Sequence, residues 1–107
     1  METKIVIRDI SGQIIYTPTI EIEACDEVRD AIYEALSNHV CLSYAQLSHQ
    51  NLSFMELQGV ILSHAIFNYA RLNYSDLSNS NLEGANFKNA NLLGVDFSGA
   101  NLIGANF

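Results

Sequence analysis

A few side chains in this sequence have the chemistry to bind a metal ion or to act as a nucleophile or a base. They are the three histidines, His39, His49 and His64, and the two cysteines, Cys25 and Cys41. A zinc site needs about four ligands that converge on one point. Nucleophilic catalysis needs a nucleophile, a base and a group that orients the base. The spacing of these residues shows neither set, and no glycine-rich phosphate-binding loop occurs. Whether any of them meet depends on the elements that carry them.

A five-residue period runs through the last two thirds of the chain. Counting back in fives from the final residue, every position as far as residue 42 is leucine or phenylalanine. We call these fourteen positions the central residues, and they are Leu42, Leu47, Leu52, Leu57, Leu62, Phe67, Leu72, Leu77, Leu82, Phe87, Leu92, Phe97, Leu102 and Phe107. The residue two before each of them is small or apolar, with Gln50 as the exception. The residue directly before is often Asn or Asp, and the residue two after is often Gly.

This period excludes a leucine-rich helix, because residues five apart turn by about 500° per step and form no stripe. The stretches GANF, NANLLG and SGANLIG closely resemble the pentapeptide-repeat family, whose pattern is A-(D/N)-L-x-x. The resemblance covers about residues 40–107 and weakens before residue 70, where Ile61, Ile66 and Arg71 replace the Asn or Asp.

The resemblance implies an all-β solenoid, the right-handed quadrilateral β-helix, in which each pentapeptide forms one face and four form a coil. About three and a half coils would stack into a rod of roughly 17 Å at strand spacing. The central residues from Leu42 to Phe87 would form a core ladder. A slip of one residue would bury Asn or Asp, which is costly without hydrogen-bond partners. We therefore predict that Leu72→Asp unfolds the protein and that Asn91→Ser, at a position that faces water, is nearly silent.

Residues one coil apart would share a column, and the columns keep the candidate ligands apart. His49 shares a column with Tyr69, and His64 shares one with Tyr44. Neither cysteine joins a histidine. We therefore predict no metal site, no cofactor, no catalytic residue and no enzyme activity.

One column does gather like charges. Glu56, Asp76 and Asp96 share it, about 4.8 Å apart between coils. The column could be a cation site or a recognition stripe. Alternatively, these acids only fill the Asn or Asp position of the family and are solvated there.

The residues before the repeat form a separate unit, so we divide the chain into residues 1–39 and 40–107. Residues 4–17 alternate in polarity on both sides of a Ser-Gly pair, which predicts two strands and a β-hairpin. Residues 19–23 alternate again and predict a short third strand.

Residues 26–38 predict a helix whose apolar face includes Ile32 and Leu36, with Cys25 or Asp26 near its N-cap. The ends of a solenoid expose an apolar cross-section and unpaired strand edges. We therefore expect the hairpin and the helix to form an N-terminal cap on the first coil.

The early coils carry apolar and aromatic residues at outward positions where the later coils have Gly and Asn. Exposed groups of this kind are typical of an interaction surface. The alternative is that the N-terminal hairpin folds over some of them. The candidate partner surface consists of Tyr44, Phe54, Ile61, His64, Ile66, Tyr69 and Tyr74.

The sequence ends on the apolar Phe107, with no helix, proline or charge run after it. Either another molecule covers the last coil, or that coil frays. Two-fold arrangements are common among oligomers, and some proteins of the family that the repeat resembles pair in this way. We expect a homodimer that joins the C-terminal coils through Leu92, Phe97, Leu102 and Phe107.

Charge and hydropathy limit the kinds of partner. The net charge is −7, yet residues 41–107 hold only four acids and two bases. Without a basic patch, direct nucleic-acid binding is not expected. No run of 18 apolar residues indicates a membrane helix. The N-terminus has no signal-peptide pattern, which favours a cytoplasmic location.

These features favour a non-catalytic protein–protein interaction or scaffold module with an unidentified protein partner. The resemblance to quinolone-resistance pentapeptide proteins implies an alternative, a mimic of duplex DNA that binds a type II topoisomerase such as DNA gyrase. Such mimics are longer and strongly acidic, whereas this repeat region has only a small net negative charge. A structural filler with no strong partner stays open as a third reading.

Overall fold

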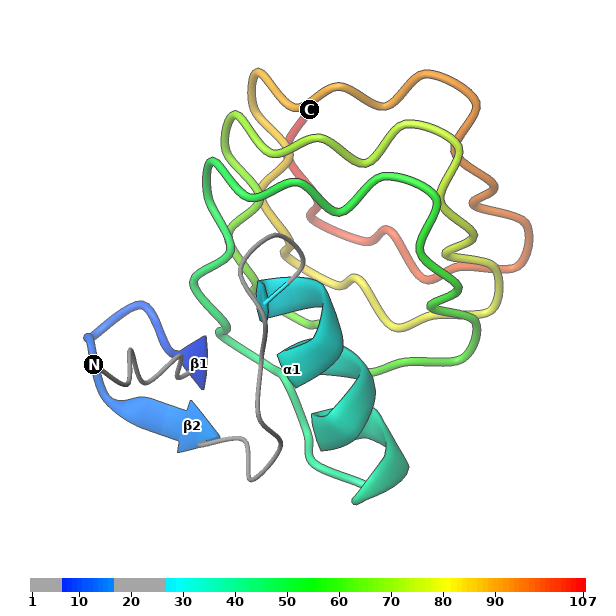
Figure 1. Cartoon of the computed structure of the whole chain (residues 1–107). Coiled ribbons are helices and arrows are strands. Elements are labelled where there is room, and N and C mark those ends of the chain that lie inside the picture. Colours follow the sequence, from blue (N-terminus) through cyan, green and yellow to red (C-terminus); the bar gives the residue numbers. More distant parts are fainter. Residues whose placement is uncertain (1–6, 17–26) are drawn as a thin grey trace.

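The structure is a computed structural model that describes residues 7–16 and 27–107. Strand β1 (Ile7–Arg8) is followed by strand β2 (Ile14–Tyr16) and helix α1 (Glu27–Ser37), after which the chain winds in successive coils (Figure 1). The predicted third strand at residues 19–23 and the predicted N-cap at Cys25 or Asp26 lie outside the described residues.

Parallel backbone pairing between successive coils holds the repeat region together. Isolated bridges join Gln46 to Ile66, Ile66 to Asn86 and Asn86 to Asn106, and the other parallel bridges have the same spacing. Each step is twenty residues, or four pentapeptides. The N–H of each central residue as far as Phe87 donates to a carbonyl of the next coil, for example at 2.7 Å in the bond from Phe67 to Asn86. The repeat region is therefore a β-helix.

The central residues fill the interior of the coils. The ten from Leu42 to Phe87 are at most 3% exposed, and the rings of Phe67 and Phe87 stack with their centroids 4.9 Å apart. Most of the residues two positions before a central residue are buried with them, including Ala65 and Ala70. Removing a buried leucine side chain costs roughly 2–5 kcal/mol, so these buried side chains contribute strongly to the stability of the coils.

Each corner of a coil is a tight turn. The N–H of Ala65 donates to the carbonyl of Leu62, and the N–H of Ala70 donates to that of Phe67. The third residue of each turn has a positive φ, as in a type II turn, for which glycine is the preferred residue. Gly84, for example, has a φ of 66°. The five-residue period therefore includes one left-handed residue at each corner.

The polar residue before each central residue stabilises the same turn. The Oδ1 atom of Asn91 accepts a hydrogen bond from the N–H of Leu93 at 3.1 Å, and Asn81, Asn86 and Asn101 do the same two residues onward. This is the Asx-turn contact, in which a short polar side chain closes a backbone turn. The position thus has a structural role besides facing water, which the sequence interpretation had not assigned to it.

Two serines take the place of small apolar residues inside the coils. Ser75 Oγ donates to the carbonyl of Leu52 at 2.6 Å, and Ser80 Oγ donates to that of Leu57 at 2.7 Å. Both serines are buried. A buried hydroxyl costs little once it is hydrogen-bonded, and carbonyls of the preceding coil supply these bonds.

The N-terminal hairpin docks beside the first coil. β1 and β2 pair antiparallel, and Oδ1 of Asp9 accepts the N–H groups of Ser11 and Gln13 in the turn between them. The hydroxyl of Ser11 also donates to this oxygen, and it is the main cause of the lowered pKa of Asp9. The hairpin is held to the coil because the N–H of Gln46 donates to the carbonyl of Arg8 at 2.7 Å.

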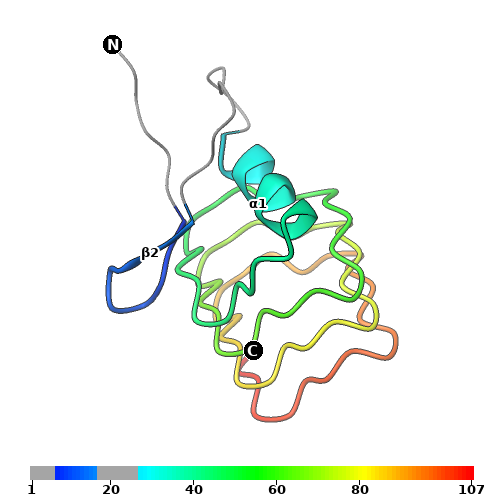
Figure 2. The same cartoon turned by 90° about the horizontal axis from the view of Figure 1, so that it is seen from below.

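Helix α1 lies at one end of the stack of coils, opposite the last coil (Figure 2). Its residues Ala31, Ile32 and Ala35 are buried in the same apolar cluster as Leu42. They recur at the spacing of one helix face. Among the residues that the structure describes, no helix is both long and apolar enough to cross a membrane.

Candidate interaction surface

Two of the candidate metal ligands, His49 and His64, lie on separate corners of the coils. His49 stacks on Tyr69 with ring centroids 5.1 Å apart, and His64 stacks on Tyr44 at 4.8 Å. Within residues 7–16 and 27–107, no group of three or more His, Cys, Asp or Glu side chains could hold a metal ion. His49 and His64 are therefore ring partners for tyrosines in this structure.

Cys41 is an exposed thiol beside the first central residue. Its Sγ atom lies 3.2 Å from Oγ of Ser43, and this contact, together with the backbone N–H of Ser43, lowers the pKa of the thiol. Cys25 lies outside the described residues.

Three stacked aromatic pairs mark three corners of the early coils. Two of these pairs are the histidine–tyrosine stacks described above. The third pair is Phe54 with Tyr74, whose ring centroids are 5.3 Å apart. Each pair joins one coil to the next, and every member occupies the left-handed position of its turn, with φ between 59° and 65°. We call these six residues the aromatic corner pairs: Tyr44 with His64, His49 with Tyr69, and Phe54 with Tyr74.

These residues stand where the fold favours glycine. A left-handed conformation costs a residue with a β-carbon roughly 1–2 kcal/mol, and a stacked ring pair returns about 0.5–1.5 kcal/mol for two such residues. The next coil has glycine at two of the three corners, and a Cβ at Gly94 would lie 2.5 Å from Cδ1 of Tyr74. A Cβ at Gly84 would collide with the ring of His64. Stacking alone therefore does not offset the backbone strain of the aromatic corner pairs.

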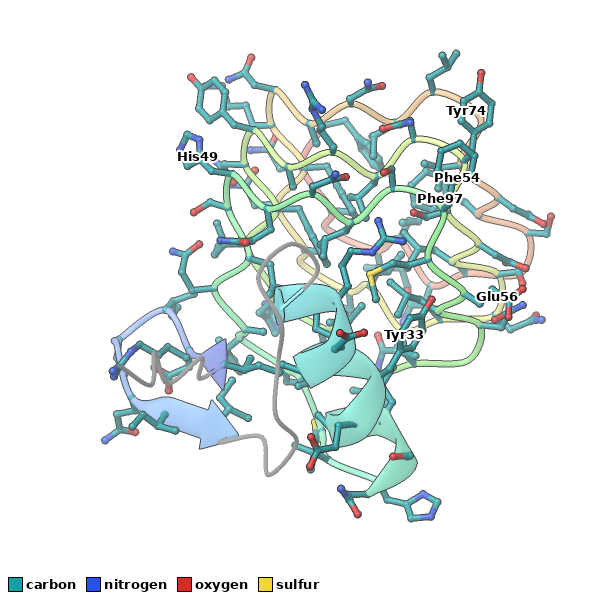
Figure 3. All side chains as sticks on the ribbon, viewed as in Figure 1. Tyr33, His49, Phe54, Glu56, Tyr74 and Phe97 are labelled. Atoms are coloured by element: carbon teal, nitrogen blue, oxygen red, sulfur yellow. The ribbon has the colours of Figure 1, made fainter. Side chains whose placement is uncertain are left out.

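The structure separates the predicted partner surface into several places. Figure 3 shows His49 on one side of the stack and Phe54 and Tyr74 on the other. Phe54 is 64% exposed and Tyr74 is 53% exposed. Tyr44, Ile61 and Tyr69 are exposed too, together with His64, whereas Ile66 is only half-exposed.

Residues 7–16, the described part of the hairpin, cover little of this surface. Their backbone pairing with the coils reaches Ala45 and Gln46, and Ile66 pairs with Gln46 in the backbone. The remaining six candidates keep exposed side chains.

Sequence reasoning missed Leu93, which is 63% exposed. It directly precedes Gly94, whose backbone lies against the ring of Tyr74, so Leu93 extends the corner of Phe54 and Tyr74 toward the last coil. An apolar residue directly after a central residue, where the other repeats mostly have Ser or Asn, was the signal that could have revealed it.

The acidic column is present as a row of neighbouring residues. Parallel bridges join Glu56 to Asp76 and Asp76 to Asp96. Oδ1 of Asp76 accepts the N–H of Ser78 at 2.9 Å. Asp96 accepts both the hydroxyl and the N–H of Ser98, and these bonds lower the pKa of its carboxyl, the hydroxyl being the larger cause.

An open groove of about 550 Å³ lies between α1 and the end of the first coil. Tyr33 and Leu36 from the helix form one wall, and Val60 and Ile61 form another. Glu56 lines it as well, and its N–H donates to the hydroxyl oxygen of Tyr33 at 2.8 Å. The groove was not predicted, because it depends on where the helix packs.

The predicted dimer residues lie together at the end of the stack away from α1. Leu92, Phe97 and Leu102 are only partly buried, unlike the earlier central residues, and Phe107 is 60% exposed. The ring of Phe107 stacks on that of Phe87 at 5.2 Å.

Comparisons with known proteins agree with the five-residue period. The family model described as pentapeptide repeats matches residues 41–79 and 70–107, with eight copies. A solved pentapeptide repeat protein from the thylakoid lumen of Arabidopsis thaliana is 34% identical, with a TM-score of 0.60, over 61% of this chain and 45% of its own. The pentapeptide repeat protein Rfr23 from the cyanobacterium Cyanothece 51142 is 32% identical, with a TM-score of 0.51, over 52% of this chain and 38% of its own.

The chain therefore spans less than half the length of either solved relative. No curated protein sequence matches it. Solved proteins with this repeat adopt a β-helix, which is the arrangement that the pairing of residues twenty apart produces here.

Proposed function

The chain belongs to the pentapeptide-repeat family, and from this premise we propose that it is a non-catalytic protein-interaction module whose contact surface includes the aromatic corner pairs. The observation that carries the proposal is the placement of exposed Tyr44, Phe54, Tyr69 and Tyr74 at left-handed turn positions. Backbone strain that stacking does not offset is a reason to look for function at a site. Aromatic side chains are also enriched where proteins bind one another.

The finer architecture is part of the same proposal. We infer a right-handed quadrilateral β-helix of about three and a half coils, with the β1–β2 hairpin and α1 as its N-terminal cap and a boundary near residue 40. The burial of Ala31, Ile32 and Ala35 against Leu42 supports a capping role for the helix. The cap would leave the sides and corners of the coils free for a partner.

Site-specific photo-crosslinking in the source cells tests the interaction module. A benzoylphenylalanine is placed at position 54 or 69, with position 88 as the control because Lys88 is exposed but stands outside the aromatic corner pairs. Discrete adducts from 54 or 69 that are absent from 88 are expected. The purified partner should then bind the Phe54→Gly variant more weakly. No adduct from either corner, or the same adducts from all three positions, would contradict the proposal.

Self-association through the last coil is a second proposal. The exposure of Phe107 and the half-burial of Leu92, Phe97 and Leu102 support it, because covering them would extend the apolar interior. Light scattering coupled to size exclusion, over a concentration series, compares the chain with its Phe107→Asp variant. A dimer that the substitution dissociates is expected. A monomer at every concentration would refute the proposal.

A DNA mimic that binds a type II topoisomerase such as gyrase is the alternative, and the column of Glu56, Asp76 and Asp96 supports it. We rank it second because the repeat region holds only four acids and two bases. A gyrase supercoiling assay tests this alternative. If the protein at micromolar concentration does not inhibit supercoiling, the chain is not a DNA mimic of this kind. The predicted cytoplasmic location also stays a prediction, which cell fractionation with an antibody against the chain would test.

A further inference from the structure

One side of the β-helix carries three carboxylates in a row. Glu56, Asp76 and Asp96 are neighbours in three successive coils, and adjacent strands lie about 4.8 Å apart. The two cations of the repeats belong to other columns, since Arg71 pairs with Asn51 and Asn91 rather than with an acid, and Lys88 stands two residues after Asn86. Within the described parts of the chain, no ion pair engages any of the three carboxylates.

An exposed apolar edge borders these carboxylates. Phe54 and Tyr74 form the corner that precedes Glu56 and Asp76 in their coils, and Leu93 continues this edge before Asp96. Figure 3 shows Phe54, Tyr74 and Glu56 on one side of the stack. The face of an exposed aromatic ring attracts a cation by about 0.5–1 kcal/mol, so the edge and the acids favour the same kind of group.

The groove beside α1 opens at the same place. Glu56 lines it between the apolar walls formed by Tyr33 and Leu36 on the helix and by Ile61 on the coil. Polar residues such as Ser37 and Gln58 line the groove too, so it combines apolar side chains with polar groups and a carboxylate. This combination suits an apolar side chain that is flanked by a basic one. The groove, the carboxylates and the aromatic edge therefore form one continuous surface, which we call the acidic side.

We propose that the acidic side binds a cationic segment of a partner protein, with an apolar side chain in the groove and basic side chains against the carboxylates. The charge selects the occupant, because an anionic segment, a nucleic acid or an anionic membrane surface would be repelled. The dimensions fit an extended chain. Glu56 and Asp96 are two strand spacings apart, roughly 10 Å, and residues three apart in an extended polyproline II segment lie on one side of it at about 9 Å. This inference rests on the proposed interaction module and names the chemistry of its partner.

A charge-neutral variant isolates the role of the carboxylates. Glu56→Gln, Asp76→Asn and Asp96→Asn are combined in the full chain. The fold should tolerate them, because Asn91 and its equivalents in other repeats form the same turn-closing hydrogen bond that Asp76 and Asp96 form. The matched control is Glu83→Gln, which removes one acid from another column. Far-ultraviolet circular dichroism confirms that both variants keep the native spectrum.

The probe is a fluorescent peptide that is rich in lysine and contains a single phenylalanine, and its binding is followed by anisotropy. Its counterparts carry glutamate for every lysine or alanine for the phenylalanine. We expect saturable binding of the lysine peptide that is about tenfold weaker in the neutral variant, as removal of three exposed ion pairs implies. Glu83→Gln should change the affinity less than about twofold, and added salt should weaken binding to the native chain more than to the neutral variant.

The role of the aromatic edge is tested with Phe54→Gly, because glycine accommodates the φ of 60° at this position. About fivefold weaker binding of the lysine peptide is expected from the loss of one exposed ring. Equal affinity of the native chain and the neutral variant, or equal binding of the glutamate peptide, would overturn the proposal.

The two proposals can fail separately. Corner-specific crosslinks from position 54 without binding of the lysine peptide would keep the interaction module and refute a cationic partner. Binding of the peptide that depends on Asp76 and Asp96, without crosslinks from either corner, would refute the aromatic corner pairs as the contact and keep the acidic side.

Discussion

Glycine-to-alanine substitutions at two corners measure how the aromatic corner pairs are held. Gly59 and Gly94 have nearly the same φ, 68° and 69°. A Cβ at Gly59 meets nothing within 4 Å, whereas a Cβ at Gly94 lies 2.5 Å from Cδ1 of Tyr74. The two substitutions therefore share the backbone cost and differ in one contact, that with the ring stacked on Phe54.

The expected magnitudes follow from this difference. Alanine in a left-handed conformation costs roughly 1–2 kcal/mol, and the lower entropy of the unfolded chain returns about 0.4–1 kcal/mol. Gly59→Ala should therefore destabilise the protein by about 0–1.6 kcal/mol. Gly94→Ala should add roughly 0.5–1.5 kcal/mol, the value of the ring stack that Tyr74 must leave. For a domain of this size an excess of about 1 kcal/mol lowers the Tm by roughly 4–8 °C.

Urea unfolding followed by circular dichroism gives both free energies, and a double-mutant cycle identifies their origin. Tyr74→Gly removes the ring and leaves room for the new methyl group, since a Cβ at Gly104, which lies over Gly84, has its nearest neighbour at 3.8 Å. In this background Gly94→Ala should cost no more than Gly59→Ala. Equal costs of the two substitutions in the native chain, or an excess that survives Tyr74→Gly, would refute the packing of the ring on the glycine.

Three further predictions concern the interior, one carboxylate and one thiol. Leu72→Asp places a charge in the β-helix interior and should unfold the chain, which loss of the native circular dichroism spectrum would show. The pKa of Asp96 is lowered in the folded state, so its stabilising contribution is present above the unfolded pKa and is lost as the pH falls through the folded pKa. The difference in stability between the native chain and Asp96→Asn, measured by urea unfolding from pH 7 to pH 2.5, should therefore shrink below about pH 4. Alkylation of Cys41, followed by mass spectrometry across a pH series, should have a lower midpoint than in the Ser43→Ala variant, because the Ser43 hydroxyl lowers the pKa of the thiol.

The backbone pairing was predictable because the pattern that sets it is local and repeated. A central residue every five positions and four positions per coil place residues twenty apart side by side, and the bridge between Asn81 and Asn101 has that spacing. The same columns correctly predict that His49 lies against Tyr69 and His64 against Tyr44. A short period with one apolar residue leaves few alternative registers, because each alternative buries a polar side chain.

The turn chemistry was harder to predict because it depends on backbone geometry rather than on polarity. Asn91 was interpreted as facing water, so Asn91→Ser was predicted to be nearly silent. The hydrogen bond from the N–H of Leu93 gives this side chain a partner, and serine closes such turns more weakly than asparagine. We now expect a measurable cost of about 0.5–1 kcal/mol for Asn91→Ser.

The candidate partner surface could be predicted residue by residue but not as a shape. The sequence predicts that Tyr44, Phe54 and Tyr69 are aromatic residues that face outward. Which of them lie on the same side of the β-helix depends on the columns and on the position of the helix. The groove beside Tyr33 depends on the packing of α1, a contact between segments far apart in the chain. The function of these residues stays a prediction until a partner is found.

The later coils provide an internal control for the early ones. They build the same turns with Gly84, Gly94 and Gly99 at the corners, and each is preceded by an Asn or Asp that closes its turn. The coil before them has Ile61 and Ile66 at the turn-closing position, where no side-chain oxygen is available. A coil of this fold therefore forms without aromatic rings or isoleucines at these positions. The same chain closes its later turns with glycine and with Asn or Asp. Binding to another molecule therefore explains the aromatic residues and isoleucines of the early coils better than folding does. A partner should be sought at the early coils.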